Sequence, residues 1–114
     1  MTAKTVFQRI IDREIPADIV YEDDRCIAFK DIHPAAPVHV LIVPKQLIAT
    51  VNDVTPADEP VMGHLFSAAK AVAAKLGLAG GYRIVINCGP DAGQEVMHVH
   101  LHLLGGRKFG WPPG

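Results

Sequence analysis

The sequence is poor in cysteine, in net charge and in long apolar runs, and each of these scarcities argues against a class of protein. Its two cysteines, Cys26 and Cys88, form no CxxC pair, which argues against a disulfide-dense secreted scaffold and favours a reducing compartment. The formal net charge is −1, whereas nucleic-acid binders usually carry a basic surplus. The longest apolar runs are too short or too interrupted to span a membrane. We therefore expect a cytoplasmic protein that binds neither nucleic acid nor membrane.

What is present is typical of one soluble domain. Hydrophobic residues make up 49% of the 114-residue chain and charged residues 20%, and a chain of this length can bury a substantial core. The opening MTAKTVFQRIIDRE has charges where the apolar part of a signal peptide would lie, so no signal peptide is expected. We interpret residues 1–114 as a single domain that ends in a C-terminal tail, residues 105–114.

The spacing of apolar residues predicts the order helix, strands, helix, strands. Thr5 can cap a short amphipathic helix, and Thr55 followed by Pro56 can open a longer helix that ends near Leu76. The predicted buried face of the longer helix consists of Met62, Leu65, Phe66, Ala69, Val72, Ala73 and Leu76. Strands are predicted at residues 18–22, 25–31, 38–44, 82–88 and 97–104. Short connections favour antiparallel pairing, so we predict an α+β fold in which two helices pack on an antiparallel sheet of about five strands.

The segment MHVHLHLLGG, residues 97–106, places His98, His100 and His102 at alternate positions. In a strand, alternate side chains share a face, so the three imidazoles are predicted to lie opposite the apolar residues that begin with Met97. A solvated strand face is one interpretation, although Thr, Lys or Glu would serve there equally well. A zinc site is a second interpretation, but His98 and His102 would lie about 13 Å apart, whereas Zn–N bonds measure about 2.0–2.1 Å. We therefore expect no metal site.

Nucleophilic or acid–base catalysis is the third interpretation, and the pattern favours it. Imidazole can act as a covalent nucleophile, and neighbouring histidines can donate or relay protons. Three in a row can hold a group such as phosphate, with the central His100 placed for attack. The preceding loop, GPDAGQE, contains glycines, and backbone N–H groups in such a loop can cradle a phosphate. A plain hairpin connection explains a glycine-bearing loop as well.

Beyond the three histidines, nearly the whole chain resembles one known family. HVHLHLL matches the histidine-triad pattern, His-x-His-x-His followed by two apolar residues, and the other matching segments are IIDREIPADIVYEDDRCIAFKDIHPAAPVHVLIVPK, GYRIVIN, AGQEVMHVHLHLLGGR and WPPG. The chain thus resembles the histidine-triad nucleotide-binding (HINT) branch of the histidine triad (HIT) family. The resemblance implies a homodimer of HIT-like α+β protomers that binds purine nucleoside monophosphates. It also implies hydrolysis of adenosine 5′-phosphoramidates and aminoacyl-adenylate-like compounds through a nucleotidyl-histidine, without a cofactor.

The resemblance implies roles for individual residues. His100 corresponds to the nucleophile and His102 to a phosphate contact, while His98 orients the nucleophile, partly through its backbone carbonyl. Asp31 corresponds to the acid that accepts hydrogen bonds from the ribose 2′- and 3′-hydroxyls, although an Asx turn explains it locally. Asn87 corresponds to a ribose–phosphate contact, although its position alone favours a turn residue at the end of a strand.

Further positions complete the implied nucleotide site. The backbone N–H groups that would hold phosphate lie around Gly93, Gln94, Glu95 and Val96. The apolar slot for the base corresponds to Val6, Phe7, Ile10, Phe29 and Ile32, which alone would be assigned to the core. Trp111 corresponds to a residue at the neighbouring protomer's active site, and docking of the tail on its own domain is the alternative.

Two positions depart from the animal-type members and resemble the bacterial-type branch. Glu95 stands where those members carry Ser, and Leu47 stands where they carry His. Glu95 puts an acid near the leaving group and so bears on the amine preference. His33 stands where Ser is commoner, and we assign it no role. Two alternative functions stay open, namely a dinucleoside polyphosphate hydrolase, as in the related Fhit branch, and a nucleotide-binding regulator.

Overall fold

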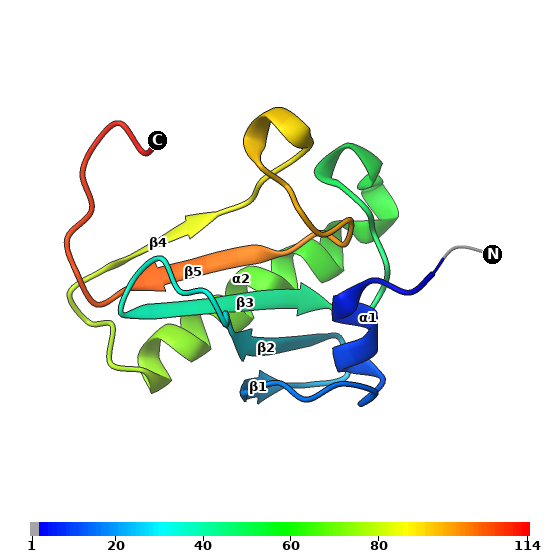
Figure 1. The fold of residues 1–114 in the computed structure, drawn as a ribbon, viewed down its shortest axis with the longest axis horizontal. Helices are drawn as coiled ribbons and strands as arrows, with labels where there is room; N and C mark the ends of the chain where they lie inside the picture. Colours follow the sequence, from blue (N-terminus) through cyan, green and yellow to red (C-terminus); the bar gives the residue numbers. More distant parts are fainter. Residues whose placement is uncertain (1–2) are drawn as a thin grey trace.

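Five strands form one antiparallel sheet in the computed structural model, which describes residues 3–114 (Figure 1). The strands are β1 (Ile19–Glu22), β2 (Cys26–Lys30), β3 (Val38–Pro44), β4 (Tyr82–Val85) and β5 (Leu101–Gly105), in the spatial order β1-β2-β3-β5-β4. The two α-helices are α1 (Val6–Ile11) and α2 (Glu59–Lys75). The predicted α+β fold, with about five antiparallel strands and two helices, is confirmed. The predicted domain spans residues 1–114, of which residues 1 and 2 lie outside the described residues.

The two helices pack against opposite faces of the sheet, because side chains alternate along each strand. Val40 and Ile42 of β3 share a core with Leu65 of α2. The intervening Leu41 instead packs in a second cluster, which includes Phe7 of α1. β3 is therefore buried on both faces, as its continuous apolar run predicts. The face that carries α1 also carries the pocket described below.

A capping box starts α1 where the sequence predicts it. The Gln8 backbone N–H donates to the Thr5 hydroxyl oxygen at 3.1 Å, and the Thr5 backbone N–H donates to Gln8 Oε1 at 2.7 Å. Such reciprocal bonds satisfy two N–H groups that a helix start otherwise leaves without partners. The cap holds the helix so that Phe7 and Ile10 are buried against the sheet.

The long helix α2 is preceded by a single 3-10 turn, Pro56–Asp58, and begins at Glu59. Pro60 is tolerated because it lies in the first turn, where a missing backbone N–H removes no intrahelical bond. The helix buries Leu65, Ala68, Ala69, Val72 and Ala73. The prediction that Phe66 also faces the core is wrong, since 48% of this residue is exposed at the edge of the apolar stripe. No helix within residues 3–114 is both long and apolar enough to cross a membrane.

The last strand is shorter than predicted. β5 begins at Leu101 rather than at residue 97, because the ladder with β3 extends no further than the pair of Ile42 and Leu101. Beyond this point the chain bonds to the segment that leaves β3, and the Val99 N–H donates to the Ile48 carbonyl oxygen at 2.6 Å. Met97 is consequently exposed, so the prediction that it belongs to the apolar face opposite the histidines is also wrong.

Candidate active site

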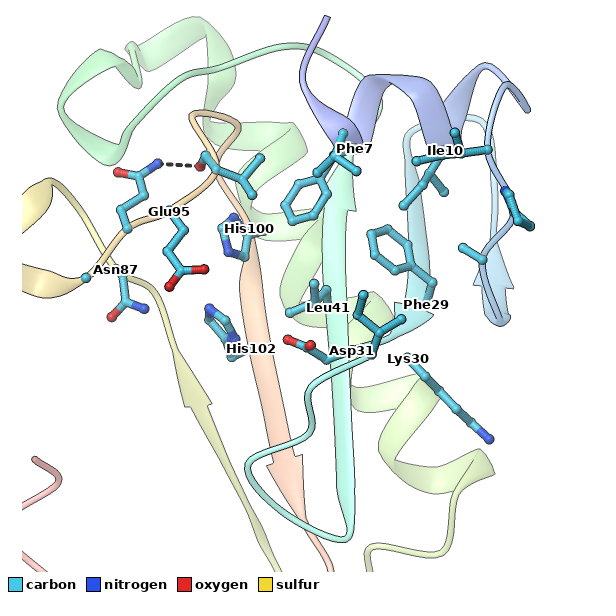
Figure 2. A pocket seen from close by; sticks show the side chains of 18 residues that line it. Phe7, Ile10, Phe29, Lys30, Asp31, Leu41, Asn87, Glu95, His100 and His102 are labelled. Carbon is cyan, nitrogen blue, oxygen red and sulfur yellow. Dashed lines mark hydrogen bonds between the residues drawn. The ribbon is translucent and has the colours of Figure 1, made fainter.

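A pocket of about 440 Å³ opens on the α1 side of the sheet (Figure 2). It lies between α1, the ends of β2 and β3, and the loop that precedes β5. Most of the residues implied by the family resemblance line it: Val6, Phe7, Ile10, Phe29, Asp31, Ile32, Asn87, Gly93, Gln94, Glu95, Val96, His100 and His102. Two implied residues, His98 and Trp111, do not line it. A volume of this size suits a small organic ligand.

The pocket has an apolar end and a polar end (Figure 2). At the apolar end the rings of Phe7 and Phe29 meet edge to face with centroids 5.5 Å apart. Leu41 and the segment of residues 15–17 extend this surface. The sequence analysis did not assign these residues to the pocket. The segment of residues 15–17 has the sequence IPA, which is typical of the end of a helix, and Leu41 lies in an apolar run that is typical of the core. Ile32 contributes at the rim, since most of its side chain is exposed.

His100 is held at the polar end with one nitrogen toward the pocket. Its Nδ1 lies 2.7 Å from the His98 carbonyl oxygen. A carbonyl oxygen can only accept, so Nδ1 carries the proton and Nε2 of the neutral ring has a free lone pair. Burial lowers the pKa of His100 and favours the neutral form. The Phe7 ring packs edge-on against the imidazole, with centroids 4.9 Å apart.

His98 lies behind the pocket rather than in it. The residue is fully buried, and its Nε2 donates to the Pro44 carbonyl oxygen at 2.7 Å. Its Nδ1 is the one buried side-chain polar atom without a hydrogen-bond partner among residues 3–114. Burial lowers the pKa of His98, so the ring is kept neutral. The ring of His98 lies on the α1 side of the sheet as predicted, 6.1 Å from the Phe7 ring, but its contact with His100 runs through the main chain.

His102 has a neighbour that sequence reasoning missed, His39 of β3. The Ala35 backbone N–H donates to His39 Nδ1 at 3.0 Å, and an N–H can only donate. His39 must then carry its proton on Nε2, which lies 2.9 Å from His102 Nδ1. The Nδ1 of His102 accepts the hydrogen bond from His39 Nε2–H. A neutral His102 therefore carries its own proton on Nε2. The two bonds together assign the tautomers of both rings.

Burial favours the uncharged form of the histidines at the polar end at neutral pH. Burial, reinforced by the neighbouring His100 and His39, lowers the pKa of His102 to about 4. The pKa of His39 is also lowered by burial, against an opposing effect of Asp31. His102 therefore offers the pocket a neutral N–H donor rather than a positive charge.

Asp31 has two functions in the structure, one of which is local. Its Oδ1 accepts the His33 backbone N–H at 2.8 Å, so the Asx turn considered as an alternative is present. Its Oδ2 lies 3.5 Å from His39 Nε2. The carboxylate also lines the pocket, opposite Asn87 and Glu95 (Figure 2).

The loop before β5 is braced by the side chain of Gln94. The Gly89 N–H donates to Gln94 Oε1 at 2.9 Å, and Gln94 Nε2 donates to the carbonyl oxygens of Ala49 and Val96. Gly93 has φ of +84°, a left-handed conformation that a side chain would strain. These features bring the backbone of residues 93–96 to the pocket wall.

The C-terminal tail lies at the end of the sheet opposite α1 (Figure 1). The Arg83 guanidinium donates to the Gly110 carbonyl oxygen at 2.8 Å, and the guanidinium groups of Arg83 and Arg107 lie over the Phe109 ring. The next residue, Trp111, is 83% exposed. The tail is thus held on its own domain as far as Gly110, while the indole contacts no part of the pocket.

Two groups of side chains within residues 3–114 have metal-ligand chemistry, and hydrogen bonds account for both. The first is Asp31, His39 and His102, whose contacts are given above. The second is Asp23, Cys26 and His64, on the α2 face. Asp23 accepts hydrogen bonds from Tyr21, from the backbone N–H groups of residues 25 and 26, and from His64 at 2.5 Å. Burial raises the pKa of the Cys26 thiol to about 12, which disfavours the thiolate that a metal requires.

Comparison with known proteins agrees with this geometry. The HIT domain family matches residues 12–109, and the chain belongs to this family. It is 57% identical to an uncharacterized HIT-like protein of Synechococcus elongatus and 56% identical to another of Synechocystis sp., over 100% of each chain. Among solved structures it is similar to a HIT family hydrolase from Legionella pneumophila, with a TM-score of 0.95 and 49% identity over 97% of this chain and 100% of that one. A histidine triad nucleotide-binding protein from Candida albicans has a TM-score of 0.82 and 31% identity over 96% of this chain and 83% of that one.

Proposed function

We propose that this protein is a purine nucleoside phosphoramidase. It hydrolyses adenosine 5′-phosphoramidates, AMP-lysine-like conjugates and aminoacyl-adenylate-like compounds at the α-phosphorus. The observation that carries the proposal is the 2.7 Å bond from His100 Nδ1 to the His98 carbonyl oxygen, which leaves the Nε2 lone pair for attack. The relatives add support, since one is described as a hydrolase and another as nucleotide-binding.

The two ends of the pocket suit the two ends of a nucleotide. The purine packs on the apolar end of the pocket, which Phe7 and Phe29 line, and the ribose hydroxyls lie near Asp31. The phosphoryl group then lies against His100 and His102. His102 donates its Nε2–H to a phosphoryl oxygen, and the backbone N–H groups of Glu95 and Val96 stabilise the charge that grows there.

The proposed reaction has two steps. His100 Nε2 attacks the α-phosphorus and forms a new P–N bond, while the P–N bond to the amine breaks and the amine takes up a proton from solvent as it leaves. Water then attacks the same phosphorus and releases a proton to solvent, the bond from phosphorus to His100 Nε2 breaks, and AMP leaves. The imidazole returns to its neutral form with the proton on Nδ1, still bonded to the His98 carbonyl oxygen.

We also propose that the active protein is a homodimer. β4 is an edge strand that pairs only with β5 within residues 3–114, and its partly apolar YRIV segment has an unpaired side. Trp111, exposed at the end of the tail, would then reach the pocket of the partner. Light scattering should give twice the chain mass at all working concentrations, and a monomer at every concentration would contradict the proposal.

The function is tested with two substrates and two variants. Adenosine 5′-phosphoramidate and a diadenosine polyphosphate are incubated with the natural protein, with His100→Ala and with His33→Ala. His33 is an exposed histidine outside the pocket and serves as the matched control. We expect AMP release from the phosphoramidate by the natural protein and His33→Ala, with near-total loss in His100→Ala. Preference for the polyphosphate, or full activity of His100→Ala, would overturn the proposal.

A further inference from the structure

The polar end of the pocket contains a carboxylate that no cation neutralises. Glu95 extends from the loop before β5 and directs its carboxylate into the pocket, on the side of Asn87 and toward His100 and His102 (Figure 2). It takes part in none of the ion pairs found within residues 3–114. An acid in such a place is a feature that the binding of a phosphoryl group alone does not explain.

The rest of the pocket wall supplies no compensating charge. Asp31 brings a second carboxylate on the opposite side. Lys30 is the one lysine or arginine among the lining residues, and its side chain extends away from the cavity toward Asp18, 3.5 Å from its Nζ (Figure 2). His100 and His102 are neutral, as described above. Before substrate binds, the polar end is therefore acidic.

A nucleotide adds negative charge to this acidic end. Like charges at close range oppose each other, and water around the exposed Glu95 moderates this repulsion. A substrate that carries a positive charge beside the phosphoryl group offsets this repulsion and is therefore favoured. With the base in the apolar slot, the group attached on the far side of the phosphorus extends toward Glu95 and Asn87.

We propose that Glu95 determines leaving-group specificity and selects nucleoside phosphoramidates whose amine carries a further positive charge, such as the conjugates of diamines. This inference rests on the proposed function and names the substrate class of the same site. The Glu95 carboxylate pairs with the distal ammonium of the leaving group. Leaving groups that end in a carboxylate are disfavoured by the same charge.

Three substrates of similar length separate charge from shape. Adenosine 5′-phosphoramidates of 1,3-diaminopropane, propylamine and β-alanine end in an ammonium, a methyl and a carboxylate group. For the natural protein we expect kcat/KM to fall in that order. The preference for the diamine over propylamine should be about fivefold, the size of a solvent-exposed ion pair. Raising the ionic strength should reduce it, because exposed charges are screened.

Variants assign the preference to Glu95. Glu95→Gln keeps the shape and removes the charge, so the diamine should lose its advantage and the kcat/KM values for the diamine and propylamine should become similar. Glu95→Lys should reverse the order in favour of β-alanine. Asp91→Asn, which changes an exposed acid of the same loop outside the pocket, is the matched control and should keep the natural preference. Thermal melting of each variant checks that it folds.

The failures of the two proposals are distinguishable. Hydrolysis of all three substrates with equal kcat/KM, or a diamine preference that persists in Glu95→Gln, overturns the role of Glu95 and leaves the phosphoramidase function standing. Hydrolysis of none of the three overturns both.

Discussion

Replacing His39 tests how the structure prepares His102. His39 accepts one hydrogen bond, from the Ala35 N–H at 3.0 Å, and donates another to His102 Nδ1 at 2.9 Å. His39→Leu fills similar space but removes both bonds. The Nδ1 of His102 then has no donor, and the proton can move from Nε2 to Nδ1. The variant therefore loses the N–H that His102 is proposed to direct at the phosphoryl group.

The size of the effect follows from the bonds that are lost. A neutral hydrogen bond contributes about 1 kcal/mol, and a buried polar group without a partner costs about 1–3 kcal/mol. We expect His39→Leu to lower the free energy of unfolding by about 1–3 kcal/mol in urea denaturation. We expect kcat/KM to fall about tenfold, which corresponds to about 1.4 kcal/mol of lost transition-state stabilisation.

Nuclear magnetic resonance reads the tautomer directly. Nitrogen-15 spectra of the natural protein should show His102 protonated on Nε2, and His39→Leu should show a mixture of tautomers. His39→Gln, whose amide can donate from a similar position, should recover most of the activity. A natural protein with His102 protonated on Nδ1, or a His39→Leu variant with unchanged kcat/KM, would refute the reasoning.

Three further predictions concern stability and the tail. Burial lowers the pKa of His102 from 6.5 to about 4. Between these two pH values the unfolded chain binds more protons than the folded chain. The stability that this group contributes above pH 6.5 is therefore lost as the pH falls toward 4. The loss is at most about 3 kcal/mol for this group, and a urea midpoint that does not fall between pH 7.5 and pH 5 would contradict it. Leu65→Ala should lower the free energy of unfolding by about 2–5 kcal/mol, whereas the exposed Phe66→Ala should change it much less, and equal losses would place Phe66 in the core. Deleting residues 111–114 should change kcat/KM by different factors for different leaving groups, and identical kinetics would exclude a role of Trp111 in the site.

The elements of the fold follow from local patterns. Thr5 with Gln8 three residues later makes the cap of α1, and the apolar spacing of α2 identifies most of its buried face. The continuous apolar run of residues 38–44 predicts that β3 is buried on both faces. These features depend on neighbours within a few residues, so the sequence alone contains them. The first residue of β5 depends instead on where its backbone hydrogen bonding to β3 ends, and this position is set by the whole sheet.

The site was predictable where the family resemblance marks a residue and not where only the fold brings residues together. His39 and His102 are 63 positions apart in the chain, and their contact requires the register in which Leu41 faces His102. The alternation in β3 places His39 on the same face as Leu41, and this was the one available signal. Alternation gives the face of His98, but it does not show that the ring lies behind the pocket, because the chain at this point is bonded to Pro44 and Ile48.

The central claim is that His100 forms the covalent intermediate, and a rapid-quench experiment tests it most directly. The natural protein is mixed with adenosine 5′-phosphoramidate, quenched within a turnover in base, which preserves a phosphorus–nitrogen bond to histidine, and analysed by peptide mass spectrometry. We predict one adenylyl group on the peptide that contains residues 98–102, with fragmentation assigning it to His100, and no adduct in His100→Ala. An adduct on His98 or His102, or an adduct that persists in His100→Ala, would contradict the account.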